Sequence, residues 1–301
     1  MQGVRMATAA TASVSLSLAC LGAGILSFPW ALATSRLPAF LVVGVFVLSA
    51  ASVGLVALAR QTLIFCAASS GDEHEPWCYD RLVEQAFGPR TGLCATVAIM
   101  LNQLGSLVGF LVAVADWGAP ALAEIFPASF GSSGALRAAL LGSLGILVLW
   151  PLSWSRSLHA LWLPSSLSVL AVASVAGVII WRGATRDEAW SPCASTNAAA
   201  AAANTTPPLD LITWPASASE LLECVPIILF GFNAHLQAPL VALEVFRATG
   251  HASGWPLFCA IVVPATLLTC ALLYASTAFA GVQCYGSATT NDILSNLGSD
   301  L

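Results

Sequence analysis

The strongest constraint on this chain is an uncharged run at residues 6–35, which is long enough to cross a bilayer but is interrupted in its middle. Gly22 and Gly24 weaken a helix there, and Pro29 has no N–H, so the carbonyl of Ile25 loses its helical partner. Unpaired backbone at membrane depth is tolerated only where it is buried in protein or lines a cavity. The run therefore predicts either a helix broken at a binding site or a glycine-rich helix packed closely against a neighbour.

The composition places the chain among multispan membrane proteins. Hydrophobic residues make up 58% and charged residues 8%, with a mean hydropathy of +0.85, whereas soluble domains carry about 25% charged residues. The lipid bilayer is thus an expected partner, and the net charge of −5 provides no basic patch for nucleic acid. The nine cysteines form no CxxC pair and no Cys/His ligand spacing, so we expect no metal site. No acid, base and nucleophile share a predicted pocket, so we expect no enzyme.

Apolar segments predict an all-α protein with seven spans. Their expected bounds are 6–35, 39–59, 91–115, 138–154, 157–181, 223–244 and 256–280. Elsewhere we expect an amphipathic helix at 79–88, a flexible loop at 182–211 and a polar tail at 281–301. Span six is interrupted again, since Pro226 and Pro239 flank its centre. Span three holds the amide side chains of Asn102 and Gln103. At this depth amides usually form hydrogen bonds between helices, and the alternative is that they contact the substrate.

The arginines predict a cytoplasmic N-terminus, with six on the inner side and four on the outer side. The sequon at Asn204 falls outside in this topology, so we expect a glycan there. Cys193 and Cys284 also fall outside and are candidates for a disulfide in an oxidising space. We expect a multi-pass protein of the plasma membrane or of a vacuolar or lysosomal membrane.

Five short motifs, in order along the chain, resemble those of the amino acid/auxin permease family. Residues 22–31 read GAGILSFPWA, similar to the G-[SA]-G-[IV]-L-x-[LF]-[PA]-[YW]-A pattern of the family's first helix. The other four are YDRLVEQAFG at 79–88, PL at 151–152 with RSLHAL at 156–161, VPIILFGFNAH at 225–235 with Glu244, and Gly286 with NDIL at 291–294. The two interrupted spans, one and six, stand five spans apart, as in a fold built from five-helix repeats.

The resemblance implies an all-α polytopic membrane protein with a leucine-transporter-like fold. Residues 1–301 would form one incomplete transporter domain, with a first repeat at about 6–182 and the start of a second at about 216–281. It also implies secondary active symport of an amino acid held at the two breaks. The residues implied are Gly22, Ala23, Gly24, Ile25 and Leu26 in span one, and Phe230, Gly231 and Asn233 in span six. N–H groups around Gly24 suit a carboxylate, and carbonyls near residues 18–21 and near Phe230 suit an ammonium.

One departure from the family pattern concerns the coupling ion. Sodium-coupled members commonly place Asn four residues before the first glycine of the signature, where this chain has Leu18. Leucine offers no oxygen to a hard cation, so we expect the proton rather than sodium as the coupling ion, with no other cofactor. His235 is the candidate for proton coupling, because an unperturbed histidine pKa is about 6.5. The alternative is a core histidine satisfied by a neighbour.

Two other interpretations of the chain stay open, and a third is opposed by the sequence. The family has about eleven spans against seven here, so one is an inactive truncated fragment, and we expect the chain by itself not to complete a transport path. Another is a sensor that binds an amino acid without moving it. The third, a seven-span receptor, is opposed by the arginine distribution, the sequon and the two breaks.

Overall fold

The computed structural model describes residues 2–21, 23–68, 79–125, 133–154, 162–185, 211–215 and 217–298. Every regular element within these ranges is helical. Among the described residues, three helices are long and apolar enough to cross a membrane: Gly24–Phe65, Pro89–Gly109 and Ser253–Ala288. Three shorter helices there are also apolar: Met6–Cys20, Gly134–Leu147 and Ala173–Ala184. The all-α membrane class is confirmed, whereas the leucine-transporter-like arrangement stays a prediction.

The N-terminal part of the chain forms two helices joined by a short 3₁₀ segment. Helix α1 (Gln2–Cys20) leads into the 3₁₀ helix η1 (Ala23–Ser27), and α2 (Phe28–Ala68) follows directly. Arg36 interrupts α2 with a non-helical backbone (φ 63°, ψ 162°), so α2 contains the end of predicted span one and all of span two. A distant segment of the chain stabilises the turn at Arg36, because Leu37 N donates a hydrogen bond to Leu211 O at 2.9 Å.

The C-terminal part repeats this interrupted pattern. Helix α10 (Ala218–Gly231) begins at Ser217, whose hydroxyl accepts from Glu220 N at 3.4 Å. Helix α11 (Ala238–Thr249) has Pro239 in its first turn and ends at Gly250, which adopts φ 79°. After it, α12 (His251–Leu257), a π-helical turn η5 (Phe258–Val262) and α13 (Val263–Tyr285) follow one another without a break.

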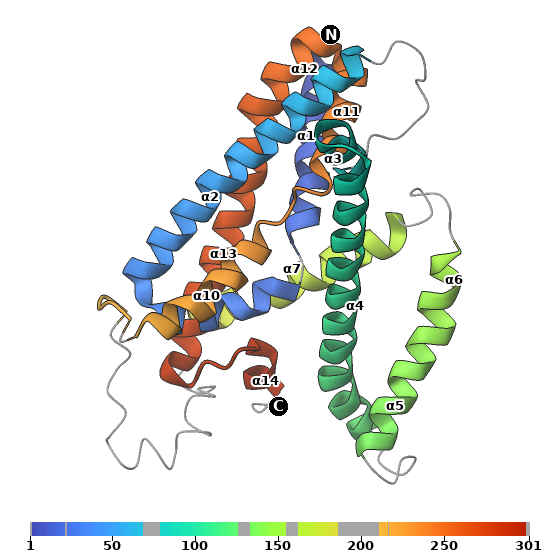
Figure 1. Cartoon of the computed structure of the whole chain (residues 1–301). Coiled ribbons are helices and arrows are strands. Elements are labelled where there is room, and N and C mark those ends of the chain that lie inside the picture. The colour runs from blue at the N-terminus through green and yellow to red at the C-terminus, as the bar shows by residue number, and fades with distance from the viewer. Residues whose placement is uncertain are drawn as a thin grey trace.

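These helices share one apolar core (Figure 1). Helices α2 and α13 run side by side, α10 crosses α2, and α13 also packs against α1 and α7 (Trp162–Thr185). The largest fully buried side chains include Leu16, Phe28, Leu55, Phe246 and Tyr274.

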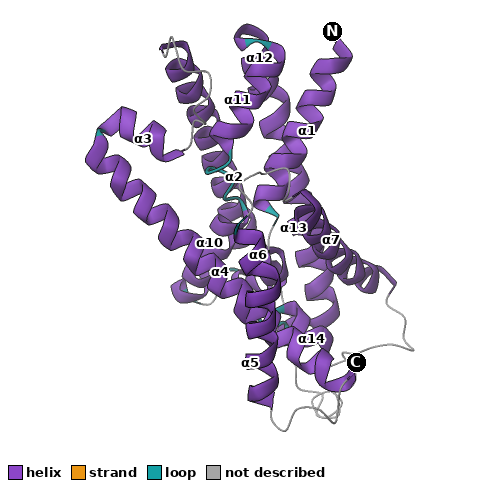
Figure 2. Cartoon of the chain, turned by 90° about the vertical axis from the view of Figure 1, so that its right-hand side faces the viewer, coloured by secondary structure: helices purple, strands orange, loops and turns teal. Residues whose placement is uncertain are grey.

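A second group of helices stands beside this core. It comprises α3 (Tyr79–Phe87), α4 (Pro89–Ile125), α5 (Ser133–Leu144), the π-helical turn η2 (Gly145–Leu149) and α6 (Trp150–Ser153). Helix α4 packs mainly against α5 and against α3, which meets its first turn at an angle (Figure 2), and α4 stands apart from α2 and α13 in Figure 1. The predicted amphipathic helix is confirmed as α3, which buries Leu82. Asn102 and Gln103 are both exposed on α4.

Several helices extend past their predicted ends. Helix α5 starts at Ser133 rather than 138, α7 continues to Thr185 beyond 181, and α13 continues to Tyr285 beyond 280. The expected polar tail contains a further helix, α14 (Ile293–Gly298), whose Ile293 is fully buried. Gly286, at φ 53°, ends α13, and the chain then returns so that Ile293 packs beside Gly281.

Candidate functional site

The predicted break in span one is present. A backbone hydrogen bond from Leu21 N to Ser17 O, at 2.8 Å, closes the last turn of α1, and Leu21 itself lies beyond the end of the helix. The chain resumes at Ala23 as a 3₁₀ helix, and Pro29 occupies the first turn of α2, where its missing N–H costs least. Gly22 lies outside the described residues.

The predicted break in span six is also present, between Gly231 and Ala238. Phe232 N donates to Leu229 O and Asn233 N to Phe230 O, both at 3.3 Å, which tightens the last turn of α10. Pro226 lies inside α10 and does not end it. The interruption therefore falls on the 232–237 turn.

The two breaks lie against each other. A Cβ atom built on Gly24 would sit 3.6 Å from Phe230 Cδ1, an ordinary van der Waals contact. A Cβ built on Gly231 would lie 2.7 Å from Cζ of Phe28, so the Phe28 ring occupies the space that any side chain there would need. The structure thus brings Gly24, Phe230 and Gly231 together, and their role in binding a substrate stays a prediction.

Tyr274 of α13 joins the two breaks and was not singled out from the sequence. Its hydroxyl lies 2.7 Å from Cys20 O and 2.8 Å from Gly231 O, the last helical residues of α1 and α10. Its ring stacks on Phe28 at 4.2 Å between centroids and meets Phe232 edge-on at 5.3 Å. The available signal was a tyrosine hydroxyl deep in an apolar span, which must find a partner.

The remaining predicted site residues differ in exposure. Ile25 and Leu26 bury their side chains in the core, so any polar contact of these residues with a ligand comes from their backbone. Phe230 is 45% exposed, and Asn233 is half-buried in the turn. For Ala23 the backbone alone is described.

An apolar cavity of about 160 Å³ adjoins the break in span one. Residues of the break, of α7 and of α13 line it: Leu21, Ile25, Ala173, Ala176, Gly177, Ile180 and Leu273. No charged side chain is among these residues, so the cavity suits an uncharged group.

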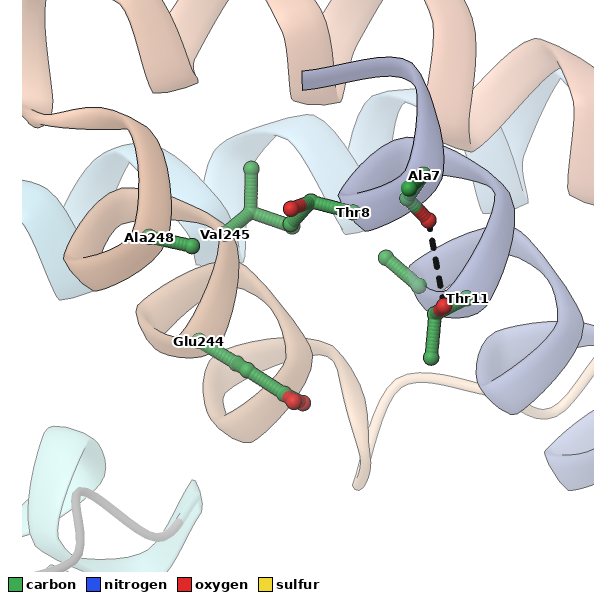
Figure 3. A pocket seen from close by; sticks show the side chains of 7 residues that line it. Ala7, Thr8, Thr11, Glu244, Val245 and Ala248 are labelled. Carbon is green, nitrogen blue, oxygen red and sulfur yellow. Dashed lines mark hydrogen bonds between the residues drawn. The ribbon is translucent and has the colours of Figure 1, made fainter. Parts of the chain in front are cut away.

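A larger pocket of about 330 Å³ lies between α1 and α11 (Figure 3). One wall carries Thr8 and Thr11 of α1, and the other carries Glu244 and Val245 of α11. The Thr11 hydroxyl donates to Ala7 O at 3.0 Å, so its lone pairs are what it can offer to a ligand.

His235 lies in the span-six turn and packs on α2. A Cβ built on Gly54 would be 2.6 Å from His235 Nε2, so the imidazole rests directly against the Gly54 backbone. This contact locates the histidine, and its role in proton coupling stays a prediction.

Three other predicted features have no test here. Asn204 and Cys193 lie outside the described residues, and Cys284 is half-buried in the last turn of α13. Within the described ranges no three His, Cys, Asp or Glu side chains gather as metal ligands would. The glycan, the disulfide and the lack of a metal therefore stay predictions.

The sequence profile of a family described as "Transmembrane amino acid transporter protein" matches residues 5–301. The chain belongs to this family. The membership confirms the resemblance drawn from the five motifs, and it identifies the relatives as transporters rather than enzymes.

Curated relatives agree with the family. Human "Sodium-coupled neutral amino acid transporter 7" is 26% identical over 285 residues, covering 94% of this chain and 55% of the relative. The rat protein of that name is 25% identical over 286 residues, with the same coverage. Human "Solute carrier family 38 member 8" is 29% identical over 305 residues, covering 95% of this chain and 60% of the relative. The chain thus spans little more than half the length of these relatives, and no solved structure matches it.

Proposed function

We propose that the protein carries out secondary active transport of neutral amino acids, with the substrate held where the breaks of spans one and six meet. The observation that carries this proposal is the contact of Gly24 with Phe230, 3.6 Å from a built Cβ, in a chain of an amino acid transporter family. Two interrupted helices that meet inside a membrane protein expose backbone N–H and C=O groups to one point.

Each part of an amino acid has a matching group at this point. The carboxylate is assigned to the N–H groups at the start of η1 and α2, around Gly24, Ile25 and Leu26. The ammonium is assigned to the carbonyls that end α1 and α10, those of Cys20 and Gly231. An uncharged side chain fits the apolar cavity beside Ile25, and several relatives are named as transporters of neutral amino acids.

The coupling ion in this proposal is the proton, with His235 as the group that carries it. Leu18 replaces the oxygen-bearing residue expected for sodium, which supports the proton, while the relatives named as sodium-coupled are the reason to test both ions. The membrane concerned is the plasma membrane or a vacuolar or lysosomal membrane.

Binding and uptake by the purified 301-residue chain test the proposal. We expect saturable, stereoselective binding of labelled neutral amino acids in detergent, with no competition from lysine or aspartate. Uptake into liposomes that scales with this binding identifies transport by the chain alone, and binding without uptake identifies a sensor or an incomplete transport path. Absence of any stereoselective binding would contradict the proposal.

A further inference from the structure

The Tyr274 hydroxyl meets the two carbonyls that the proposed function assigns to the substrate's ammonium. It lies 2.7 Å from Cys20 O and 2.8 Å from Gly231 O. A hydroxyl has one proton and satisfies one carbonyl fully or two carbonyls in part, whereas an ammonium has three protons and satisfies both. The tyrosine is therefore the weaker of two donors for the same pair of acceptors.

Aromatic packing fixes the place of this hydroxyl. The Tyr274 ring is stacked on Phe28, with an interplanar angle of 17°, and meets Phe232 edge-on at 81°. Phe28 begins the outer half of span one, and Phe232 follows the end of α10. Since the ring is also 1% exposed, the hydroxyl can leave the carbonyls only when the backbone at the breaks moves.

We propose that the Tyr274 hydroxyl holds the ends of α1 and α10 together by these hydrogen bonds in the substrate-free protein, and that the substrate's ammonium replaces it on the two carbonyls. We call this hydrogen-bonded arrangement the latch. Because one hydroxyl serves both helix ends, release of α1 and release of α10 occur together. Tyr274 is in this sense a positioning residue, which links the two broken helices through α13. The identity of the displacing group rests on the proposed function, whereas the latch itself does not.

Tyr274→Phe isolates the hydroxyl, because it keeps the ring that contacts Phe28 and Phe232. Two buried thiols report on the closed state: Cys20, whose carbonyl the latch holds, and Cys270, whose Sγ lies 3.9 Å from Ser17 O. We expect both to react about five- to tenfold faster with a small methanethiosulfonate in Tyr274→Phe, the factor that one lost hydrogen bond accounts for. Exposed Cys94 provides the baseline rate.

Thr266→Val is the matched control. Thr266 is also a buried hydroxyl on α13 that donates to a carbonyl of α1, at 3.3 Å to Ser13 O, but it contacts neither break. We expect Thr266→Val to leave the rates of Cys20 and Cys270 unchanged. Equal rates in the two variants would overturn the latch.

Amino acid binding separates a latch from a simple structural bond. If the ammonium displaces the hydroxyl, Tyr274→Phe lowers the apparent Kd for a neutral amino acid about five- to tenfold. If the Tyr274 hydrogen bonds only maintain the shape of the site, Tyr274→Phe should instead raise the apparent Kd. Weaker binding in Tyr274→Phe would therefore overturn displacement. Failure of the unmodified protein to bind any amino acid would refute the proposed function, while the thiol rates would still decide the latch.

A measurement that keeps Tyr274 covers the case in which Tyr274→Phe does not fold. The chain has three tyrosines, so Tyr79→Phe with Tyr285→Phe leaves Tyr274 as the only one. The tyrosine doublet in ultraviolet resonance Raman spectra reports whether the hydroxyl donates a hydrogen bond. A saturating neutral amino acid is expected to change this doublet, and an unchanged doublet would exclude displacement.

Discussion

The space around a residue at the breaks limits which side chain fits there. Gly231 has no side chain because the Phe28 ring fills that place, with a built Cβ 2.7 Å from Cζ, and Tyr274 Cε2 lies 3.3 Å away. Two stacked rings on one glycine form a rigid contact, since neither ring has a flexible end that could yield. The closeness of spans one and six therefore depends on this glycine.

Gly231→Ala should destabilise the protein by about 1–3 kcal/mol, the usual cost of overpacking a tight core. Gly44→Ala is the matched control, because a Cβ on Gly44 would have no atom within 4 Å. The midpoint of thermal unfolding in detergent should fall for Gly231→Ala and stay level or rise for Gly44→Ala. Equal midpoints for both variants would show that the Phe28 contact is not tight.

The sequence indicated some of these residues and concealed others. The glycines and prolines that interrupt spans one and six are local signals, because they weaken a helix wherever it packs. The partner of the Cys20 and Gly231 carbonyls is not local, since Tyr274 is 254 and 43 residues away from them. Only the packing of α13 between the two breaks reveals it.

At the scale of elements, helix ends follow caps that the chain encodes. Ser217 and Glu220 begin α10, Pro239 begins α11, and Gly250 and Gly286 end α11 and α13. Hydropathy alone placed the end of span seven at 280, because the segment that follows it, 281–301, is polar overall. The helix continues to Tyr285, whose buried side chain and that of Val282 pack into the core. Packing therefore extends helices past the point where composition changes.

Ser217→Ala should cost about 0.5–2 kcal/mol, because the first turn of α10 loses the acceptor for Glu220 N. Ser217→Asp keeps a side-chain oxygen at the cap and should restore stability. Unfolding midpoints of the three proteins in detergent provide the comparison. The cap is unimportant if the alanine variant melts with the wild type.

At the scale of the whole molecule, the helices form a packed core and a second group that contacts it little. The core of α1, α2, α7, α10, α11 and α13 holds both breaks, while α4 exposes Asn102 and Gln103. Hydropathy predicted where apolar helices lie, but it carries no information on which helices touch.

Topology is testable on the intact chain through Asn204. With a cytoplasmic N-terminus the sequon lies outside, so expression in a eukaryotic cell should add a glycan. Asn204→Gln should abolish the resulting shift in gel mobility. A wild type without glycan, together with a 186–210 segment protected from external protease, would reverse the assigned orientation.

The coupling ion is tested by exchanging the two gradients. With Leu18 in place of an oxygen ligand, uptake or binding at acidic pH should be the same in choline buffer as in sodium buffer. His235→Gln should remove the dependence on the proton gradient while leaving binding in place. Strict dependence on sodium in the wild type would refute proton coupling.

The central claim is that the two breaks form one amino acid site, and binding by Gly24 variants tests it most directly. Alanine fits, since its Cβ would lie 3.6 Å from Phe230 Cδ1, whereas the extra methyl groups of valine would crowd both Phe230 and the N–H groups of η1. Scintillation proximity binding of a labelled neutral amino acid should show Gly24→Ala close to wild type and Gly24→Val at least about tenfold weaker, with both variants folded. Wild-type affinity in Gly24→Val would contradict the claim, because the glycine would then serve packing alone.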